Sequence, residues 1–238
     1  MSAQVQPQKT AGNLLLTRLA VHERNAVHRS AEAVSLGAGE VLLRANSRSE
    51  HVFFPIDSVV SMVRTLQGGA AMELALIGSE GMVGLDVLMD AKRQLDDFVV
   101  QDPGWAYRIS ATDLTNQFRR AGGLQKYLLR FADALLAQVA QTAVCARFHS
   151  AEARLARWLL MIHDRTGRPQ IQAPLTAVRT MLGLSEERAR EAVGKLVAGN
   201  VISLRQQIIV MTDRPGLEVR ACECYETVRQ EYARTLSL

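Results

Sequence analysis

The positions of hydrophobic and polar residues follow a strand-like pattern between Leu36 and about Ile109. Short runs of β-branched and aromatic residues are separated there by glycine and other turn-forming residues, which is typical of an antiparallel sandwich or barrel. Gln67-Gly68-Gly69 is the clearest hairpin turn, because glycine adopts the positive φ that tight turns require. The pattern predicts strands at residues 40–45, 51–56, 58–66, 72–77, 97–101 and 105–109.

The hydrophobic period becomes helical after about Thr112. Apolar and small polar residues then recur at alternating steps of four and three, which is the spacing of a coiled-coil seam. One interpretation is a dimerisation helix over residues 122–149. The other is an amphipathic helix that covers its own β-domain, and we favour the first. The predicted seam consists of Leu124, Leu128, Phe131, Leu135, Gln138 and Thr142 at the dimer interface, followed by Cys145 and His149.

A third pattern begins at Ser150, a helix-capping residue, and the helix that follows is expected to end at Gly167. Two shorter helices joined at Gly183 come next, then two strand-like runs around residues 206–207, and a final helix over 216–236. Helix, glycine turn, helix and hairpin is the order of a winged helix-turn-helix, whose second helix lies in the DNA major groove. A helical hairpin with a charged surface would account for the two helices but not for the hairpin after them.

The second of these short helices has the features of a DNA-reading helix. Ser185 is a good N-cap, and Glu186 is favourably placed at the positive end of the helix dipole. The outward face carries basic side chains, which can contact phosphates or guanine edges. The inward stripe is predicted to be Ala189, Val193, Leu196 and Val197. The predicted DNA-contacting residues are Thr176, Arg179, Ser185, Glu187, Arg188, Arg190, Glu191, Lys195 and Arg205.

Five collinear segments of the chain resemble the Crp/Fnr superfamily of transcription regulators: GEVLLRANSRSEHVFFPIDSVVSMV, ELALIGSEGMVGL, CARFHSAEARLARWLLMIHDR, MLGLSEERAREAVGKLVAGNVI and ACECYETVRQEY. The resemblance extends over about residues 14–236. It implies an α+β protein with an N-terminal antiparallel β-roll, or jelly-roll, sensor of the cyclic-nucleotide-binding type at 1–121. A dimerisation helix at 122–149 and a C-terminal winged helix-turn-helix at 150–238 would follow. It also implies a homodimer that regulates transcription by binding double-stranded DNA at a near-palindromic operator, with RNA polymerase as a further partner.

The residues that hold cyclic nucleotides in that superfamily are replaced here. By the resemblance, a Gly-Glu-Leu segment that holds the ribose falls on Gly84-Leu85-Asp86, and an arginine-containing segment that holds the cyclic phosphate falls near Asp96-Asp97. The arginine is absent and two carboxylates stand in its neighbourhood, which is unfavourable for a phosphodiester in a partly desolvated pocket. We therefore expect no binding of cyclic AMP in the family's manner. The effector would be another small molecule, or the protein would have none.

The predicted recognition helix also departs from many relatives, which begin it with arginine where this chain has Ser185-Glu186-Glu187. Acidic residues at the groove-facing start weaken the attraction to phosphate, although a glutamate can accept a hydrogen bond from cytosine. An alternative function is therefore a family member with degenerate DNA recognition that acts as a ligand-sensing or protein-interaction module. Salt-dependent binding to DNA would distinguish the two functions.

Composition and motifs narrow the classes of function that remain. A net charge of +4 permits nucleic-acid binding without requiring it. The motifs of P-loop enzymes, zinc proteases and α/β-hydrolases are missing from the sequence, so we expect that the protein is not an enzyme. Polar residues 1–12 predict an unstructured tail rather than a signal peptide. No apolar run approaches the roughly 18–20 residues of a membrane span, so we expect a cytoplasmic protein without a membrane segment.

The three cysteines, Cys145, Cys222 and Cys224, form no disulfide framework, which agrees with a reducing compartment. We interpret Cys222 and Cys224 as small buried packing residues, because a two-residue spacing on a helix directs the two thiols to different faces. A zinc site also needs about four ligands, and the five histidines show no ligand spacing. We expect neither a metal nor a cofactor.

Overall fold

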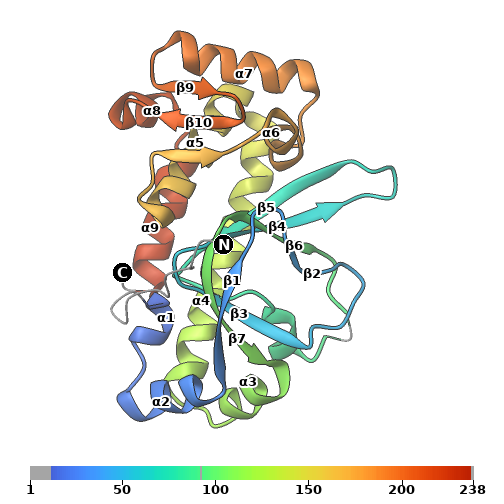
Figure 1. Ribbon diagram of the computed structural model, residues 1–238, viewed down its shortest axis with the longest axis vertical. Helices are drawn as coiled ribbons and strands as arrows, with labels where there is room; N and C mark the ends of the chain where they lie inside the picture. Colours follow the sequence, from blue (N-terminus) through green and yellow to red (C-terminus); the bar gives the residue numbers. More distant parts are fainter. Residues whose placement is uncertain (1–11, 92, 237–238) are drawn as a thin grey trace, which may run out of the picture.

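The computed structural model describes residues 12–91 and 93–236, so the predicted tail at 1–12 lies almost wholly outside the described residues. The β-rich part consists of two antiparallel sheets (Figure 1). One sheet has the order β1 (Ala31–Leu36), β7 (Gly104–Ser110) and β3 (His51–Pro55). The other has the order β2 (Val41–Leu43), β6 (Asp97–Asp102), β4 (Val59–Thr65) and β5 (Ala71–Ile77). The predicted N-terminal antiparallel β-domain is confirmed.

The six strands expected from the hydrophobic runs correspond to β2 through β7, with ends that differ by a few residues. The hairpin between β4 and β5 turns at the predicted glycines. Gly69 has a φ of 80°, and the backbone N–H of Leu66 donates to the carbonyl oxygen of Ala70 at 2.8 Å. Strand β1 was not expected, because it lies at a sheet edge and most of its residues are not buried, so its sequence carries little hydrophobic signal.

Short helices precede, interrupt and follow these strands: α1 (Leu14–Thr17), α2 (Val21–Arg29), the 3-10 helix η1 (Leu85–Met89) and α3 (Ala111–Phe118). Asn13 caps α1, and its Oδ1 accepts hydrogen bonds from the backbone N–H groups of Leu15 and Leu16. The Nδ2 of the same side chain donates to the carbonyl oxygens of Pro55 and Gly81. Because Asn13 is fully buried, its two bonds to Pro55 and Gly81 attach the start of α1 firmly to the β-domain.

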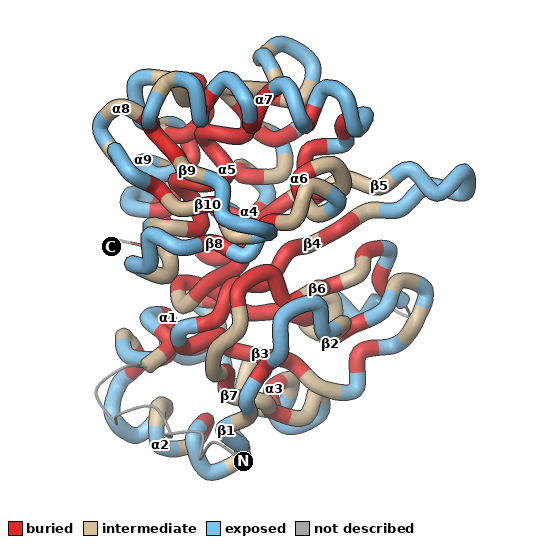
Figure 2. Tube along the Cα trace, turned by 45° about the horizontal axis from the view of Figure 1, so that its top comes forward, coloured by how far each residue is buried: buried red, intermediate tan, exposed pale blue. Residues whose placement is uncertain are grey.

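The long helix α4 (Gly123–Phe148) runs alongside the β-domain and places the predicted dimer seam inside the chain's own core (Figures 1 and 2). All six predicted interface residues are buried: Leu124, Leu128, Phe131, Leu135, Gln138 and Thr142. The ring of Phe131 lies so close to Gly81 that a Cβ on Gly81 would collide with it. Gln138 donates to the carbonyl oxygen of Leu76. These side chains are not free to contact a second copy, so the alternative in which the helix covers its own β-domain accounts for them.

Among the described residues, α4 alone is long and apolar enough, by length and composition, to cross a membrane. We expected no apolar run of that length. The difference arises because apolar residues occupy more than one face of α4: Leu128 lies in the core, whereas Leu136 lies on the surface.

The C-terminal third has the predicted order of a winged helix-turn-helix. Ser150 caps its first helix by accepting a hydrogen bond from the backbone N–H of Ala153, and Gly167 ends that helix with a φ of 65°. A strand that was not expected, β8, extends the predicted hairpin into a sheet of order β8-β10-β9. The final helix is two helices, because the backbone is extended at Ala221. The elements are α5 (Ala151–Thr166), β8 (Gln170–Gln172), α6 (Leu175–Leu182), α7 (Glu186–Ala198), β9 (Ile202–Arg205), β10 (Ile208–Met211), α8 (Arg214–Arg220) and α9 (Cys224–Leu236).

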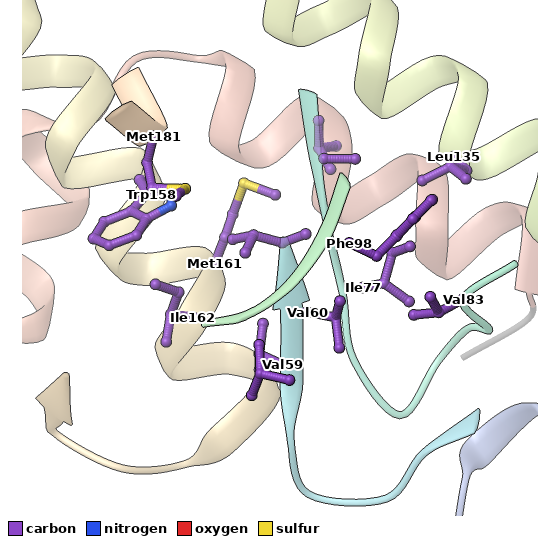
Figure 3. Packing of buried hydrophobic residues seen from close by; sticks show 14 of the residues in the cluster. Val59, Val60, Ile77, Val83, Phe98, Leu135, Trp158, Met161, Ile162 and Met181 are labelled. Carbon is purple, nitrogen blue, oxygen red and sulfur yellow. The ribbon is translucent and has the colours of Figure 1, made fainter. Parts of the chain in front are cut away.

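One hydrophobic core extends through the β-domain, α4 and the C-terminal third. Figure 3 shows Met161 and Ile162 of α5 beside Val59 of β4. A buried ion pair crosses the same boundary, where the Nε of Arg165 in α5 donates to Glu80 at 2.8 Å. The C-terminal third is therefore packed onto the β-domain by apolar and polar contacts together. The domain boundaries remain a prediction: 1–121, 122–149 and 150–238.

Candidate functional site

The turn between α6 and α7 has the geometry of a helix-turn-helix. Gly183 ends α6 with a left-handed backbone (φ 59°), which glycine adopts without a steric penalty. Ser185 then caps α7, and its Oγ accepts a hydrogen bond from the backbone N–H of Arg188. The cap that the sequence predicts is formed, and it fixes the direction in which α7 leaves the turn.

One face of α7 packs against the core and the opposite face is exposed. Its buried residues are Ala189, Ala192, Val193 and Leu196. Val197, predicted for the buried stripe, is 38% exposed instead, because the helix turns Ala192 inward. In Figure 1, α7 lies at the end of the molecule opposite α2 and α3, and Figure 2 shows its outer positions exposed. The predicted outward residues are all exposed: Ser185, Glu187, Arg188, Arg190, Glu191 and Lys195.

Ion pairs within α7 neutralise part of this outer face. Arg190 pairs with Glu186 at 2.8 Å and Lys195 pairs with Glu191 at 2.7 Å, each across one helical turn. The side chain of Arg188 has neither a hydrogen bond nor an ion pair to any residue that the structure describes. Arg188 is therefore the cation of this face that is most free to contact an incoming anion.

The other predicted DNA contacts lie on α6 and on the hairpin. Thr176 is exposed in the first turn of α6, and Arg179 lies 3.8 Å from Glu186 of α7. Arg205 is exposed at the end of β9, directly before the turn to β10. The structure thus places Arg205 at the tip of a β-hairpin that follows the helix-turn-helix, as a wing requires.

A cavity of about 340 Å³ lies between the β-domain and α4. Four of the five residues predicted for a ligand pocket line it: Gly84, Leu85, Asp86 and Asp96. Asp97 does not, and its carboxylate accepts a hydrogen bond from the backbone N–H of Ala45 at 2.8 Å. Gly84 is required at its position, because its φ is 95° and a Cβ on it would lie 3.1 Å from Val52.

The cavity contains an arginine that the sequence reasoning missed. The Nε and Nη2 of Arg64 on β4 donate to the two carboxylate oxygens of Asp96, at 2.5 and 3.0 Å. Asp96 is therefore paired, which corrects the expectation of unpaired carboxylates at this place. The register of β4 with β6, which pairs Val63 with Asp97, brings Arg64 and Asp96 together across 32 positions of sequence. The hydrogen bond to Asp96 also raises the pKa of Arg64, so the guanidinium stays charged.

Asp86 is the second carboxylate of the cavity. Its Oδ2 accepts a hydrogen bond from the Oγ of Ser49 at 2.9 Å. Its Oδ1 is buried and has no partner among the described residues. The cavity therefore holds one cation and two carboxylates, which leaves a net negative charge at its polar side.

Apolar side chains form most of the remaining wall. The lining from the β-domain is Met62, Leu74, Ile77, Met82, Leu85, Met89, Leu95 and Phe98, and the lining from α4 is Ala132, Leu135, Leu136 and Val139. Methionine side chains adapt to irregular shapes, and three of them lie here. The cavity can enclose an apolar group with one ionic group at its side.

A second apolar stripe runs along α4, one residue after each position of the predicted seam from Leu128 to Cys145. This outer stripe consists of Leu129, Ala132, Leu136, Val139, Ala143 and Ala146. Successive residues of a helix are about 100° apart, so the outer stripe lies beside the buried seam. Leu129 and Leu136 are 57% and 67% exposed, so the outer stripe presents a continuous line of apolar side chains at the surface of the chain. Because Leu136 also lines the cavity, the outer stripe and the cavity adjoin.

Comparison with known proteins identifies the β-domain and the fold. Residues 33–121 match the family model described as "Cyclic nucleotide-binding domain". None of the curated proteins matches the chain in sequence.

Solved structures match over most of the chain. A putative transcriptional regulator of the Crp/Fnr family from Eubacterium rectale has a TM-score of 0.67 at 13% identity, covering 87% of this chain and 97% of its own. FixK2 from Bradyrhizobium japonicum has a TM-score of 0.67 at 15% identity, covering 81% and 98%. The c-di-GMP responsive global regulator CLP from Xanthomonas campestris has a TM-score of 0.64 at 15% identity, covering 81% and 99%.

At 13–15% identity, structural similarity shows that these proteins share a fold, but it does not show that they share an activity. The fold agreement extends over more than four fifths of this chain and nearly the whole length of each solved chain. Residues 33–121 are therefore similar to the cyclic nucleotide-binding domain family, and the chain as a whole has the fold of the solved Crp/Fnr-family transcription regulators.

Proposed function

We propose that this protein is a DNA-binding transcription regulator of the Crp/Fnr type that acts in the cytoplasm as a homodimer, with RNA polymerase as a further partner. The observation that carries the proposal is the exposed face of α7, where Ser185 caps the helix and Arg188 is unpaired among the described residues. An arginine so placed can donate two hydrogen bonds to one guanine edge in the major groove. Thr176, Arg179 and Arg205 would add phosphate contacts on either side.

The outer stripe of α4 is the surface that supports a dimer. Two parallel copies of α4 would pack Leu129 against Leu129 and Leu136 against Leu136, with the small side chains Ala132 and Ala143 allowing a close approach. We therefore propose the outer stripe as the dimer interface, in place of the buried seam residues that the sequence predicted. A two-fold axis along α4 would place the two α7 helices in successive major grooves of a near-palindromic operator, with centres about 34 Å apart.

The cavity gives this dimer a means of regulation. A molecule bound against Leu136 and Val139 would touch α4 at the stripe that carries the dimer contact. Binding would then favour the arrangement of the two α4 helices that fits the ligand, which is a two-state coupling between the sensor and the DNA-binding parts. The lining favours an effector that is largely apolar over a cyclic nucleotide.

Titration of the full chain with cyclic AMP should show no binding tighter than millimolar. The guanidinium of Arg64 is occupied by Asp96, and the cavity holds two carboxylates against one cation. A like charge about 5 Å from a cyclic phosphate costs roughly 3 kcal/mol at an effective dielectric constant near 20. Isothermal titration calorimetry measures this directly. Micromolar affinity for the unmodified chain would contradict the assignment of the cavity.

The Asp96→Ala variant should gain the cyclic AMP binding that the unmodified chain lacks. It frees Arg64 to pair with a phosphate and removes one of the two carboxylates, so cyclic AMP should then bind measurably. Asp97→Ala is the control, because Asp97 is the neighbouring carboxylate but does not line the cavity. Equal affinities for the two variants would show that the charge balance of the cavity does not control nucleotide binding.

Arg188→Ala should weaken specific DNA binding by about tenfold or more, because a bidentate arginine–guanine contact is worth about 1–3 kcal/mol per half-site and a dimer makes it twice. Arg190→Ala should have a smaller effect, because Arg190 is already paired with Glu186. The binding site is first selected from host genomic DNA at physiological salt and then titrated against each variant. Arg120→Ala is the control, an exposed arginine after α3 at the other end of the molecule. Equal loss for Arg120→Ala and Arg188→Ala would indicate general electrostatics rather than reading by α7.

One observation favours the second candidate, a family member that acts as a ligand-sensing or protein-interaction module without specific DNA recognition. The exposed side chains of α7 comprise Glu186, Glu187 and Glu191 against Arg188, Arg190 and Lys195, so this face carries no net charge. Non-specific attraction to phosphate would be weak. If no genomic fragment is enriched, and the weak binding that remains lacks a salt dependence, this second function replaces the first.

A further inference from the structure

The C-terminal end of α4 and the start of α9 bring four metal-binding side chains together. Cys145 lies in the last turn of α4 and His149 directly follows that helix, whereas Cys222 lies between α8 and α9 and Cys224 begins α9. One ligand atom from each residue lies within 4.8 Å of the other three. The expectation that Cys222 and Cys224 point apart was wrong, because Cys222 precedes α9 and the two residues do not share a helix. All three cysteines are buried, so the thiols face one another rather than the solvent.

We propose that Cys145, His149, Cys222 and Cys224 bind a single zinc ion. A tetrahedral zinc has Zn–S distances of about 2.3 Å and Zn–N distances of about 2.0–2.1 Å, so its ligand sulfurs lie about 3.8 Å apart and a sulfur and a nitrogen about 3.5 Å apart. The sulfurs of Cys145 and Cys222 are 3.5 Å apart, and the Sγ of Cys224 lies 3.4 Å from the Nδ1 of His149. Three cysteines and one histidine form a closed structural zinc site.

The spacing also distinguishes zinc from an iron–sulfur cluster. A cluster places its protein ligands on different iron atoms, so the ligands must stand farther apart than they do around one ion. Here all four ligand atoms lie within 4.8 Å of one another, which leaves room for one metal ion. Thiolate and imidazole ligands in tetrahedral geometry favour zinc among divalent ions.

Neighbouring side chains hold two of the ligands in the required state. The Nε2 of His149 lies 3.1 Å from a carboxylate oxygen of Glu223. A histidine that donates Nε2–H to a carboxylate has its lone pair on Nδ1, which is the nitrogen that faces the cysteines. The Nε2 of Gln141 donates to the Sγ of Cys224 at 3.0 Å, and such a donor stabilises a thiolate.

A buried cation close to the cluster lacks part of the negative charge that it needs. The Nη2 of Arg157 donates to Thr142, one turn before Cys145 on α4. The Nε and Nη1 of Arg157 are buried without a partner among the described residues. Leaving a buried guanidinium uncompensated is costly. Zinc with three thiolates and a neutral histidine carries a net charge of −1, and this anionic centre would balance Arg157.

The ion would add coordinate bonds between two parts of the fold that packing and hydrogen bonds already bring together. His149 follows the last residue of α4 and directly precedes Ser150, the N-cap of α5, where the C-terminal third begins. Cys222 and Cys224 belong to the segment that returns along α4. Zinc would therefore fix α9 against α4 at the point where the winged helix-turn-helix is attached. This role does not depend on DNA binding.

The test uses the full chain, expressed with zinc in the medium and purified with a reductant that does not bind metals. Elemental analysis should find one zinc per chain. Replacement by cobalt should give the strong visible absorption of tetrahedral thiolate coordination. Cys222→Ser, Cys224→Ser and His149→Ala should each lose most of the zinc. His22→Ala is the control, an exposed histidine on α2, and should keep all of it.

Glu223→Gln tests the site without removing a ligand, because Glu223 is exposed and the variant should fold. Its zinc affinity, measured by competition with a chromophoric chelator, should fall by about 10–100-fold. Unmodified protein that stays free of zinc when incubated with zinc under reducing conditions would overturn the proposal. So would equal zinc content in the cysteine variants, or a cobalt spectrum of octahedral type.

Discussion

Replacing both Leu129 and Leu136 with glutamate should convert the proposed homodimer into monomers. The two leucines are the large exposed side chains of the outer stripe, and a symmetric contact would place four new carboxylates in one apolar interface. The free energy needed to bury unpaired carboxylates there is far larger than the stabilisation that packing two helices provides. Sedimentation velocity should show a change from dimer to monomer. Because a dimer binds two half-sites at once, affinity for the operator should fall by about a hundredfold or more.

Val219→Glu is the matched control for this change. Val219 is 87% exposed on α8 and also becomes glutamate, but it lies outside the outer stripe, so the dimer and its DNA affinity should be unchanged. Leu128→Glu has a different expected result. Leu128 is fully buried, so this variant should lower the free energy of unfolding instead of separating the subunits. A dimer that survives the double change at Leu129 and Leu136 would show that the outer stripe is not the interface.

The difference between Leu128 and Leu129 shows what hydrophobic periodicity can and cannot establish. The two residues belong to neighbouring stripes that have the same steps of four and three residues along α4. The period predicts that a helix has an apolar face, but it does not say whether the partner is the chain's own β-domain or a second copy. The contact of Phe131 with Gly81 shows that this face of α4 packs on the chain's own β-domain, and the two residues are 50 positions apart in the sequence. The sequence carries no local sign of such a contact.

Features that depend on neighbouring residues were predictable. Ser150 and Ser185 cap their helices and Gly167 and Gly183 end theirs, because the capping geometry involves atoms within about four residues. The hairpin at Gly69 was predictable for the same reason, because its turn geometry depends only on adjacent residues. These local signals, with the strand-like runs, were sufficient for the resemblance to a family and for the order of most elements, but not for β1, β8 or the break between α8 and α9.

Features that depend on register or on a helix break were not predictable. Arg64 and Asp96 meet only because β4 pairs with β6 in one particular register. Cys145 and Cys222 meet across 77 residues, and the argument that separated Cys222 from Cys224 assumed a continuous helix through Ala221. The backbone is extended at Ala221, so that assumption was wrong. The two-residue spacing of Cys222 and Cys224 directs the thiols apart on a continuous helix, but it allows them to converge where a helix begins.

Acidification from about pH 8 to about pH 5 should stabilise the fold through a single buried carboxyl, Glu73 on β5. Its Oε2 accepts hydrogen bonds from the Oγ of Ser61 at 2.6 Å and from the Nε1 of Trp158 at 3.2 Å. Burial raises the pKa of Glu73 from 4.5 to about 7, and the bonds from Ser61 and Trp158 and the charges of Arg157 and Arg165 only partly oppose this shift. Because Trp158 belongs to α5, the carboxyl lies where the β-domain meets the C-terminal third.

The sign follows from proton linkage. Between pH 4.5 and about pH 7 the folded chain keeps a proton on Glu73 that the unfolded chain has lost, so the free energy of unfolding falls as the pH rises through this window. The stabilisation is fully present below pH 4.5 and is lost above about pH 7. At about 1.4 kcal/mol per unit of pKa, the whole change is on the order of 3 kcal/mol.

Urea unfolding of the unmodified chain and of Glu73→Gln, measured across this pH range, isolates the contribution of Glu73. Glutamine stays neutral, so the variant should lose this part of the pH dependence and be the more stable protein at about pH 8. Burial lowers the pKa of both His28 and His163, and these groups act in the opposite direction, so only the difference between the two proteins is diagnostic. Glu50→Gln, at an exposed position, should leave the profile unchanged. Parallel profiles for the unmodified chain and Glu73→Gln would show that Glu73 does not titrate in this window, and the carboxyl between β5 and α5 would then be a fixed part of the domain contact.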